Sequence, residues 1–422
     1  MALTTQAFGL TDVGRKRQQN EDAILIDAPL GLYAVADGMG GHAAGAVASA
    51  RAVEAVGRAV NEDPSALAEL ARDASPQHRA AAVALIESAV QRACAELYRA
   101  GLADPSKRGM GTTFVCLAIA GSRAVIGNVG DSRVYLVRGG HSHRLTEDHT
   151  LVAAQLKAGT LTREQAATSQ YKNVITRAVG IQESVQVDTL IVDLVPGDVF
   201  LLCSDGLHGY LLDDELAPLV AALNARDLPQ RLIDLANERG GKDNITAVVV
   251  SVHGDGTVAQ EVAEAQSRME ALRRIPLFRH LTYKEQMAVL SISSTRSYPA
   301  GREVVLEGEP GEDLFIVIRG RVAIEKRAVA IAELTSGGHF GEMALVENAP
   351  RSATVRALEP TRVMAIARGD LMHLMKREPL LAVKMLWSFV QVLSERLRAT
   401  NVELSEARQE LAANAVPPFT EE

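Results

Sequence analysis

The sequence predicts an α+β protein made of two unlike parts, a mixed α and β region and then a compact β unit with helices on either side. Residues 1 to about 253 hold short β-rich runs that end in Gly and Asp turns, with Ala-rich helical stretches between them. Strands and helices do not alternate regularly, which argues against a doubly wound parallel sheet. Residues 275 to about 368 hold short strands with a glycine every few residues, and a long helical stretch follows.

The elements of the first region follow from local patterns. Apolar runs bounded by turn residues predict strands, and long Ala-rich stretches predict helices. The expected strands are Gly31–Ala36, Thr112–Ala120, Val199–Cys203 and Thr246–Val252, and the expected helices are Gly45–Asn61 and Arg79–Ala100.

A break in composition at residues 254–256 ends the first region. Apolar residues then recur at steps of four and three and predict one helix face, formed by Val258, Val262, Ala265, Met269 and Leu272. This helix either packs on its own domain or links two domains. We expect domains at 1–253 and 275–400, a helical linker at 254–274, and a helix end and tail at 401–422.

The final stretch, Asp370–Leu411, is expected to be helical. Its apolar positions keep a three–four rhythm for about three heptads, through Leu386, Val390, Leu393, Leu397, Thr400, Leu404, Ala407 and Leu411. The helix therefore either lies on the β unit or forms the seam of a homodimer. Pro417 and Pro418 end any helix beyond it.

Composition excludes several classes of function. The chain has 422 residues, 47% of them hydrophobic, and a net charge of −8, so no basic field exists to bind a nucleic acid. Cys94, Cys116 and Cys203 lack Cys-x-x-Cys spacing, which favours reduced thiols over disulfides or a zinc site. Residues 1–20 lack the apolar core of a signal peptide, and no apolar run is long enough to span a membrane. These features predict a cytoplasmic protein without a membrane partner.

Acidic residues recur at turns directly after apolar strands of the first region. They stand in the segments Asn20–Asp22, Ala36–His42, Gly130–Arg133, Ser204–Gly206 and Lys242–Asn244. A single Asp-Gly pair is usually only a solvated turn. Five such segments can converge where strands end, and their carboxylates then repel one another unless a cation neutralises them.

The residue types in these segments favour a hard divalent cation. Oxygen ligands without paired His or Cys are typical of Mg²⁺ or Mn²⁺ sites. Gly38, directly after Asp37, lets its backbone carbonyl approach a metal closely. Two such ions can activate a water for attack on phosphorus. Arg17, three residues before Asn20, is the candidate to hold the phosphate through its planar fork.

These segments, in this order, resemble the metal-dependent protein phosphatase family, also called protein phosphatase type 2C. The similarity covers about residues 5 to 253. It is carried by the segments Arg17–Asp22, Asp37–His42, Gly109–Thr113, Asn128–Arg133, Asn173–Ala178, Leu202–Gly206 and Gly241–Asn244. The resemblance implies a four-layer α-β-β-α sandwich with the metals at one end of the two sheets, and a serine/threonine protein phosphatase activity.

The resemblance also assigns roles to individual residues. It implies that Asp37 bridges two metal ions, that the carbonyl of Gly38 binds one of them, and that Asp205 and Asp243 bind the other. With Arg17 on the phosphate, Asp37 and Asp205 are the expected catalytic residues.

The remaining acidic residues match weaker positions of the family. Asp131 matches a ligand of a third, weaker metal, and Glu21 and Asp22 match residues that act mostly through bound waters. The segment Asp148–Tyr171 matches a variable flap beside the site. Some members hold a histidine as proposed general acid where this chain has Met39, so we assign no side chain to that role.

A second pattern of chemistry lies in the β unit. Gly338–Leu345 is expected to be a strand that turns into one short helical turn, and Pro350–Val355 re-enters a strand. Free backbone N–H groups at such a turn attract an anion. Arg351 can hold a phosphate and Glu342 can accept hydrogen bonds from a ribose hydroxyl. The alternative is a plain surface ion pair between these two residues.

This cassette resembles that of cyclic-nucleotide-binding domains, as in kinase regulatory subunits and catabolite-activator-type regulators. The similarity covers about residues 268 to 400 and includes a β-roll pattern at Leu306–Gly320 and a helical lead-in at Ile275–Leu281. It implies a β-roll or jelly-roll that binds the cyclic nucleotide through Gly341, Glu342, Met343, Ala344, Arg351 and Ser352. Ser352 does not distinguish cyclic AMP from cyclic GMP, and we favour cyclic AMP. No helix-turn-helix follows, so DNA binding lacks a reading element.

Together these patterns predict a phosphatase for phosphoserine and phosphothreonine proteins, protein kinases among them, whose activity a cyclic nucleotide regulates. Two alternatives are a phosphatase dimerised by a nucleotide-like domain without ligand, and a catalytically inactive nucleotide sensor or scaffold.

Overall fold

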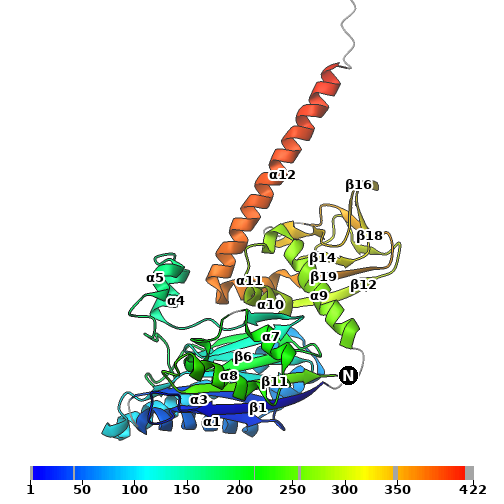
Figure 1. The fold of residues 1–422 in the computed structure, drawn as a ribbon. Coiled ribbons are helices and arrows are strands. Elements are labelled where there is room, and N and C mark those ends of the chain that lie inside the picture. Colours follow the sequence, from blue (N-terminus) through cyan, green and yellow to red (C-terminus); the bar gives the residue numbers. More distant parts are fainter. Residues whose placement is uncertain (1–2, 41–42, 213, 255–257, 346–349, 414–422) are drawn as a thin grey trace, which may run out of the picture. The chain divides into compact units, whose positions relative to one another are not determined.

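The chain folds into two compact units, Met1–Gln266 and Ser267–Glu422. The structure is a computed structural model, and it describes residues 3–40, 43–212, 214–254, 258–345 and 350–413 (Figure 1).

Two antiparallel sheets form the centre of the first unit. One has the order β1-β11-β10-β7-β8, and the other has the order β2-β3-β5-β6-β9, with the short strand β4 paired to β3. Their bounds are β1 Thr4–Asp12, β2 Asp22–Asp27, β3 Leu32–Met39, β4 Gly111–Thr112, β5 Phe114–Ala120, β6 Arg123–Val129, β7 Arg133–Arg138, β8 His141–Arg144, β9 Asp188–Asp193, β10 Val199–Cys203 and β11 Ile245–His253.

Helices cover the outer face of each sheet. The sheet with β3 packs against α1 (Ala43–Glu62), α2 (Ser65–Arg72) and α3 (Pro76–Ala103), and a short turn of helix, η1 (Pro105–Lys107), follows. The sheet with β11 packs against α6 (Asp205–His208), α7 (Leu216–Ala222) and α8 (Leu228–Glu238). Figure 1 shows these layers. The predicted four-layer α-β-β-α sandwich is confirmed.

The central strands are apolar on both faces because both faces are buried. In β3, Leu32, Ala34 and Ala36 pack with the helices. Tyr33 and Val35 are also fully buried and point to the opposite face, since side chains alternate along a strand. A strand between two covered faces has no solvent side, which explains why the predicted strands read as continuous apolar runs.

The second unit contains two four-stranded antiparallel sheets, with the orders β12-β19-β14-β17 and β13-β18-β15-β16. Phe315, Val317, Phe340, Val355 and Val363 belong to the core that they enclose. This is the predicted β-roll with flanking helices. Helix α9, Val258–Arg274, crosses the boundary between the two units. The bounds in the second unit are η2 Pro276–Phe278, α10 Tyr283–Ser291, β12 Ser293–Tyr298, β13 Glu303–Val305, β14 Asp313–Arg319, β15 Val322–Lys326, β16 Val329–Leu334, β17 His339–Phe340, η3 Glu342–Leu345, β18 Thr354–Ala357, β19 Thr361–Ala367, α11 Arg368–Arg377 and α12 Pro379–Ala413.

The stretch Asp370–Leu411 is helical, as expected, but it forms two helices, α11 and α12, with a break at Glu378. Pro379 explains the break, because proline has no N–H to donate and disfavours helical backbone at the residue before it. The predicted end at Pro417 and Pro418 lies outside the described residues.

Three further observations concern the chain as a whole. Cys94, Cys116 and Cys203 are free and buried, as expected for reduced thiols. Within the described ranges, no helix combines the length and the apolar character needed to cross a lipid bilayer. A helix, α9, forms where the apolar steps predict one, and Met269 and Leu272 of the predicted face are buried, while the side chains of Val258 and Val262 lie outside the description.

Candidate active site and nucleotide pocket

The predicted acidic residues of the first unit come from the same end of both sheets. Asp22 begins β2 and is paired in register with Asp37 on β3. Asp205 is the second residue after the end of β10, and Asp243 lies two residues before β11. Asp131 lies in the turn between β6 and β7. Carboxylates from two different sheets therefore face one another.

Hydrogen bonds join the two sheets at this end. The hydroxyls of Ser204 and Thr246 donate to Oδ2 of Asp22, at 2.8 and 2.6 Å. The carboxyl groups of Asp37 and Asp205 lie close enough to influence each other's pKa.

Burial and mutual repulsion raise the pKa values of this cluster. Burial raises the pKa of Asp37 well above its usual range, and the charges of Asp22 and Asp205 add to the effect. Burial is also the main cause that raises the pKa of Asp22 to about 7 and that of Asp131 to about 7. Carboxylates held in this way are stabilised by a nearby cation.

Several features of the site fit a divalent metal ion. Oδ1 of Asp22 and Oδ1 of Asp205 are buried, and neither has a hydrogen-bond partner within the described chain. A Cβ atom on Gly38 would collide with the carbonyl oxygen of Gly45 and lie 2.6 Å from that of Glu21. Only glycine therefore fits there, and every available ligand atom is an oxygen, as Mg²⁺ and Mn²⁺ require.

The acidic side chains are nevertheless not arranged as a complete set of metal ligands. In the part of the chain that the structure describes, no three His, Cys, Asp or Glu side chains converge tightly enough to hold one ion. The carboxyl groups of Asp37 and Asp205 influence each other's pKa, and Asp243 accepts a hydrogen bond from Arg17. Mg²⁺ commonly takes only one or two carboxylates and keeps several waters, so the residues present fit such an ion without three side chains meeting at one point.

Arg17 and Glu21 lie beside the cluster. Nη2 of Arg17 donates to Oδ2 of Asp243 at 2.8 Å, and nearly half of the Arg17 side chain is exposed. The backbone N–H of Glu21 donates to Oδ1 of Asn244 at 2.9 Å. Gly41 and His42, which complete the motif after Asp37, lie outside the described residues.

Several supporting residues were not predicted. The hydroxyl of Thr112 donates to the backbone carbonyl of Asp37, and that of Thr113 accepts from its N–H, both at 2.9 Å. Ser204 and Thr246 hold Asp22. Thr112, Thr113 and Ser204 stand in segments that carry the family resemblance, but the sequence does not show which backbone or carboxylate each one contacts.

The base of the predicted flap is tied to the site by buried polar contacts. The flap contains α4 (Leu151–Lys157) and α5 (Arg163–Ala167). At its start, Asp148 accepts two hydrogen bonds from Arg133, at 2.8 and 2.6 Å. Nδ1 of His149 accepts from the N–H of Gly130 at 3.0 Å. The flap is thus fastened to the turn that carries Asp131.

The second unit holds a partly buried cation, Arg351, which forms no ion pair with the described residues. The guanidinium of Arg351 lies against Gly311 and Gly341, and a Cβ atom on Gly341 would lie 2.6 Å from Nη1. It also lies over the ring of Phe315, 5.6 Å from the centroid. Nη1 is buried, and no hydrogen-bond partner for it exists among the described residues. Because burial lowers the pKa of Arg351, the site favours an incoming anion.

The other predicted pocket residues precede Arg351 in the sequence, except for Ser352, which follows it directly. Glu342 is buried at the start of η3, directly after Gly341, whereas Met343 is 42% exposed. The backbone N–H of Ala344 donates to the carbonyl of Gly341 at 3.1 Å, so this amide stabilises the turn. Ser352 is exposed. The alternative of a surface ion pair between Glu342 and Arg351 is not seen in the described structure.

Two antiparallel sheets between helices, with an oxygen-only acidic cluster at their shared end, define the class of metal-dependent phosphatases. The family model described as protein phosphatase 2C matches residues 14–239, and the model described as cyclic nucleotide-binding domain matches residues 295–378. The chain belongs to the protein phosphatase 2C family and carries a cyclic-nucleotide-binding domain. It is a serine/threonine protein phosphatase.

Similar proteins agree with this assignment. Protein phosphatase PhpP of Streptococcus pneumoniae is 38% identical over 248 residues, which are 58% of this chain and 96% of PhpP. Serine/threonine phosphatase stp of Listeria innocua is 36% identical over 246 residues, which are 57% and 93% of the two chains.

Solved structures support the fold. The serine/threonine phosphatase PstP/Ppp of Mycobacterium tuberculosis is 31% identical, with a TM-score of 0.53 over 60% of this chain and 100% of that chain. The catalytic domain of PstP in complex with two manganese ions is 32% identical, with a TM-score of 0.52 and the same coverage.

Proposed function

We propose that this phosphatase hydrolyses phosphoserine and phosphothreonine in proteins at the acidic cluster around Asp37, with two Mn²⁺ or Mg²⁺ ions. The observation that carries the proposal is the meeting of Asp22 and Asp37 from one sheet with Asp205 and Asp243 from the other. When bound, such ions supply a nucleophile at neutral pH by lowering the pKa of water, and they neutralise phosphate charge.

Asp37, the carbonyl of Gly38, Asp205 and Asp243 are the proposed main ligands. Asp131 would serve a weaker third ion, and Glu21 and Asp22 would act through waters. Arg17 reaches Asp243 from an exposed position, which suits it to hold the phosphate of an arriving protein substrate. Ser204 and Thr246 orient Asp22, and Thr112 and Thr113 orient Asp37.

A cyclic nucleotide is the proposed ligand of the second unit, with cyclic AMP favoured. Support comes from Arg351, a partly buried cation in a slot lined by two glycines, and from Glu342, a buried carboxylate of the same cassette. Arg351 would bind the cyclic phosphate and Glu342 the ribose 2′-hydroxyl. The backbone around Gly341 and Met343 would add hydrogen bonds to the phosphate, and Ser352 would contact the phosphate or the base.

We further propose that the nucleotide regulates the phosphatase. The test is turnover of a phosphothreonine peptide with Mn²⁺, measured alone and with each cyclic nucleotide. A change in turnover with cyclic AMP is expected. Coupling is reciprocal, so Mn²⁺ together with a phosphate mimic should change the affinity for the nucleotide. Unchanged turnover and unchanged affinity would exclude regulation, while absent turnover would exclude the phosphatase chemistry itself.

A homodimer through α12 is proposed as the working assembly. In α12, Leu381 and Met385 are buried, but Leu386, Val390 and Leu397 are each more than half exposed. Their heptad spacing makes the stripe complementary to a second copy of itself. Sedimentation should show a dimer that Leu397→Glu dissociates, while Arg398→Glu, a charge change off the stripe, leaves it intact.

The proposed domain limits are 1–253 for the phosphatase, 254–274 for the linker, 275–400 for the nucleotide domain and 401–422 for the tail. The proposed location is the cytoplasm, where the three free thiols stay reduced.

A further inference from the structure

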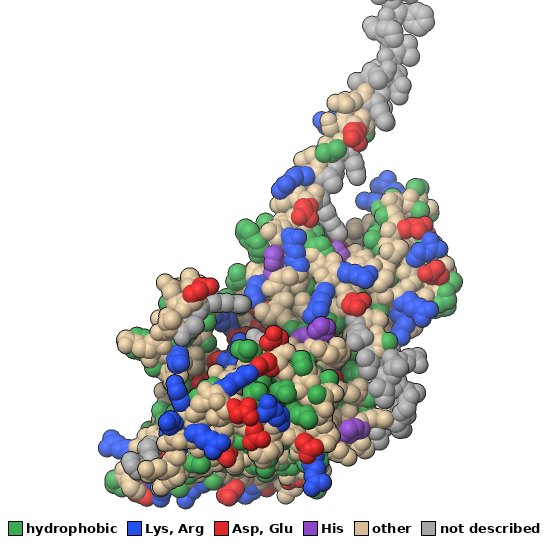
Figure 2. All heavy atoms as spheres, in the orientation of Figure 1, with side chains coloured by type: hydrophobic (Ala, Val, Ile, Leu, Met, Phe, Trp, Pro, Cys, Tyr) green, Lys and Arg blue, Asp and Glu red, His purple; other side chains and the backbone are tan. Residues whose placement is uncertain are grey.

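Four basic residues gather beside the acidic cluster, and we call them the basic rim: Arg15, Lys16, Arg17 and Lys242. All four are exposed. The chain as a whole has a net charge of −8, and over the face shown in Figure 2 basic and acidic side chains are interspersed. A purely basic group at the edge of the candidate active site is therefore a local feature.

The loop that carries Arg15, Lys16 and Arg17 is held at both ends by one buried side chain. Nδ2 of Asn244 donates to the carbonyls of Val13 and Gln19, at 3.0 and 2.9 Å, and Oδ1 accepts from the N–H of Glu21. Only 4% of Asn244 is exposed. The loop is thus fixed before any ligand arrives, which lowers the entropic cost of binding one.

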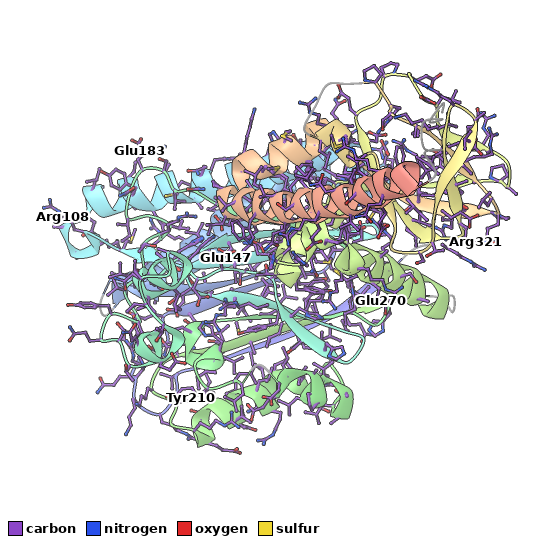
Figure 3. All side chains as sticks on the ribbon, turned by 90° about the horizontal axis from the view of Figure 1, so that it is seen from above. Arg108, Glu147, Glu183, Tyr210, Glu270 and Arg321 are labelled. Atoms are coloured by element: carbon purple, nitrogen blue, oxygen red, sulfur yellow. The ribbon has the colours of Figure 1, made fainter. Side chains whose placement is uncertain are left out.

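Close backbone contacts place Lys242 next to this loop. The N–H of Arg15 donates to the carbonyl of Gly241 at 2.7 Å. Gly14 and Gly241 both have positive φ, and a Cβ atom on Gly14 would collide with the carbonyl oxygen of Asp243. The N–H of Lys242 donates to the hydroxyl of Tyr210, labelled in Figure 3, at 3.2 Å.

Most of the rim charge is not neutralised. Arg17 pairs with Asp243. In the described residues, the side chains of Arg15, Lys16 and Lys242 make no ion pair. Fixed, exposed and uncompensated cations attract anions, whereas ordinary solvated lysines and arginines stand on mobile or mixed surfaces.

We propose that the basic rim binds negative charge that flanks the phosphorylated residue of the substrate. The substrate class is then a phosphoprotein segment with acidic side chains or a second phosphate beside the phosphate that is removed. Lys242 directly precedes the proposed metal ligand Asp243, and Arg17 donates a hydrogen bond to Asp243. An extended peptide advances about 3.3–3.6 Å per residue, so the rim faces positions a few residues from the scissile phosphate. This inference rests on the proposed phosphatase function.

The experiment compares phosphothreonine peptides of one length on the full chain with Mn²⁺. One peptide has neutral flanks, one has Glu before the phosphothreonine, one has Glu after it, and one has a second phosphoserine. The readout is the ratio of kcat/KM for each charged peptide to that for the neutral one, which cancels any general change in activity. We expect a ratio of roughly five to ten at low salt, since several exposed charge pairs each contribute modestly, and a smaller ratio at high salt.

The variant Arg15→Gln/Lys16→Gln/Lys242→Gln should bring the ratio close to one. A control with the same change in charge is Arg51→Gln/Arg99→Gln/Arg108→Gln. These arginines are exposed in or just after α1 and α3, and Arg108 lies far from Tyr210 in Figure 3. The control should keep the wild-type ratio. A wild-type ratio near one, or an equal ratio in the rim variant, overturns this inference. Absence of turnover on every peptide counts instead against the proposed function.

Comparing the charged peptides separates the two sources of negative charge. A ratio above one for the Glu peptides and the phosphoserine peptide supports general recognition of anions. A high ratio for the phosphoserine peptide alone assigns the rim to a second phosphate.

Discussion

Asp37 is the residue on which the charge balance of the acidic cluster depends. Its carboxylate is destabilised by burial, which raises its pKa, and by the charges of Asp22 and Asp205. A buried carboxylate in this position destabilises the folded state unless a cation binds it. The same residue should therefore be needed for activity and dispensable for stability in the absence of metal.

The variant Asp37→Asn should lose at least about a hundredfold in phosphopeptide turnover, because ligand changes at metal sites have effects of this size or larger. In EDTA its melting temperature should equal or exceed that of the wild type, since a repelled carboxylate has been removed. Mn²⁺ should stabilise the wild type more than the variant. Asp234→Asn, an exposed change on α8, is the control. Wild-type turnover in Asp37→Asn would exclude the proposed role.

Arg351 is the single residue on which the proposed cyclic-nucleotide binding depends most. Arg351→Gln should weaken cyclic-nucleotide binding by roughly ten- to a hundredfold, because it removes charge-assisted hydrogen bonds worth about 1.5–3 kcal/mol. Calorimetry with cyclic AMP and cyclic GMP measures the change. Arg321→Gln is the control, since Arg321, labelled in Figure 3, pairs with Glu333 and Glu359 near the surface. Equal affinities for Arg351→Gln and wild type would rule out this pocket.

Among the elements, the hairpin of β15 and β16 shows local strain. Its two turn residues, Arg327 and Ala328, have φ values of 50° and 64°. Such a turn with positive φ at both positions prefers Asn-Gly, because other residues pay a steric cost there.

Replacing the pair by Arg327→Asn/Ala328→Gly should therefore stabilise the second unit by about 1 kcal/mol. Chemical unfolding of the full chain measures the difference. Ala330→Gly, placed inside strand β16, is the matched control and should destabilise the unit. A loss of stability in the turn variant would contradict the conformation described here.

The sequence was informative about elements and less so about their contacts. Continuous apolar runs such as Val199–Cys203 predicted buried strands, and β10 has the same bounds. The break before Pro379 was not predicted, although proline disfavours helical backbone at the residue before it. The acidic residues were found because each follows a strand, but the roles of Asn244 and Thr246 depend on contacts across more than 200 positions. No local pattern reports such contacts.

At the scale of the whole molecule, two compact units predict two separable responses to ligands. A ligand present at about 100 times its Kd stabilises the folded state by about 2.7 kcal/mol. For units of this size, that corresponds to a rise in Tm of roughly 5–10 °C.

Scanning calorimetry of the full chain should show that each ligand raises the transition of its own unit most, with a smaller shift of the other transition if the proposed coupling holds. Asp37→Asn should abolish the shifts caused by Mn²⁺, and Arg351→Gln those caused by cyclic AMP. If either ligand moves both transitions in the wild type, the units are energetically coupled and regulation has a thermodynamic basis. If Mn²⁺ moves neither, the metal proposal fails.

The burial of all three thiols should protect this protein from oxidation by peroxide. Burial raises the pKa of Cys116 and of Cys203 to about 12, and it also raises that of Cys94. Peroxide attacks the thiolate, and at neutral pH almost none is present in such cysteines. The proposed active site uses carboxylates and no reactive thiol. This enzyme should thus continue to remove phosphate groups under conditions in which oxidation inactivates enzymes that depend on a catalytic cysteine.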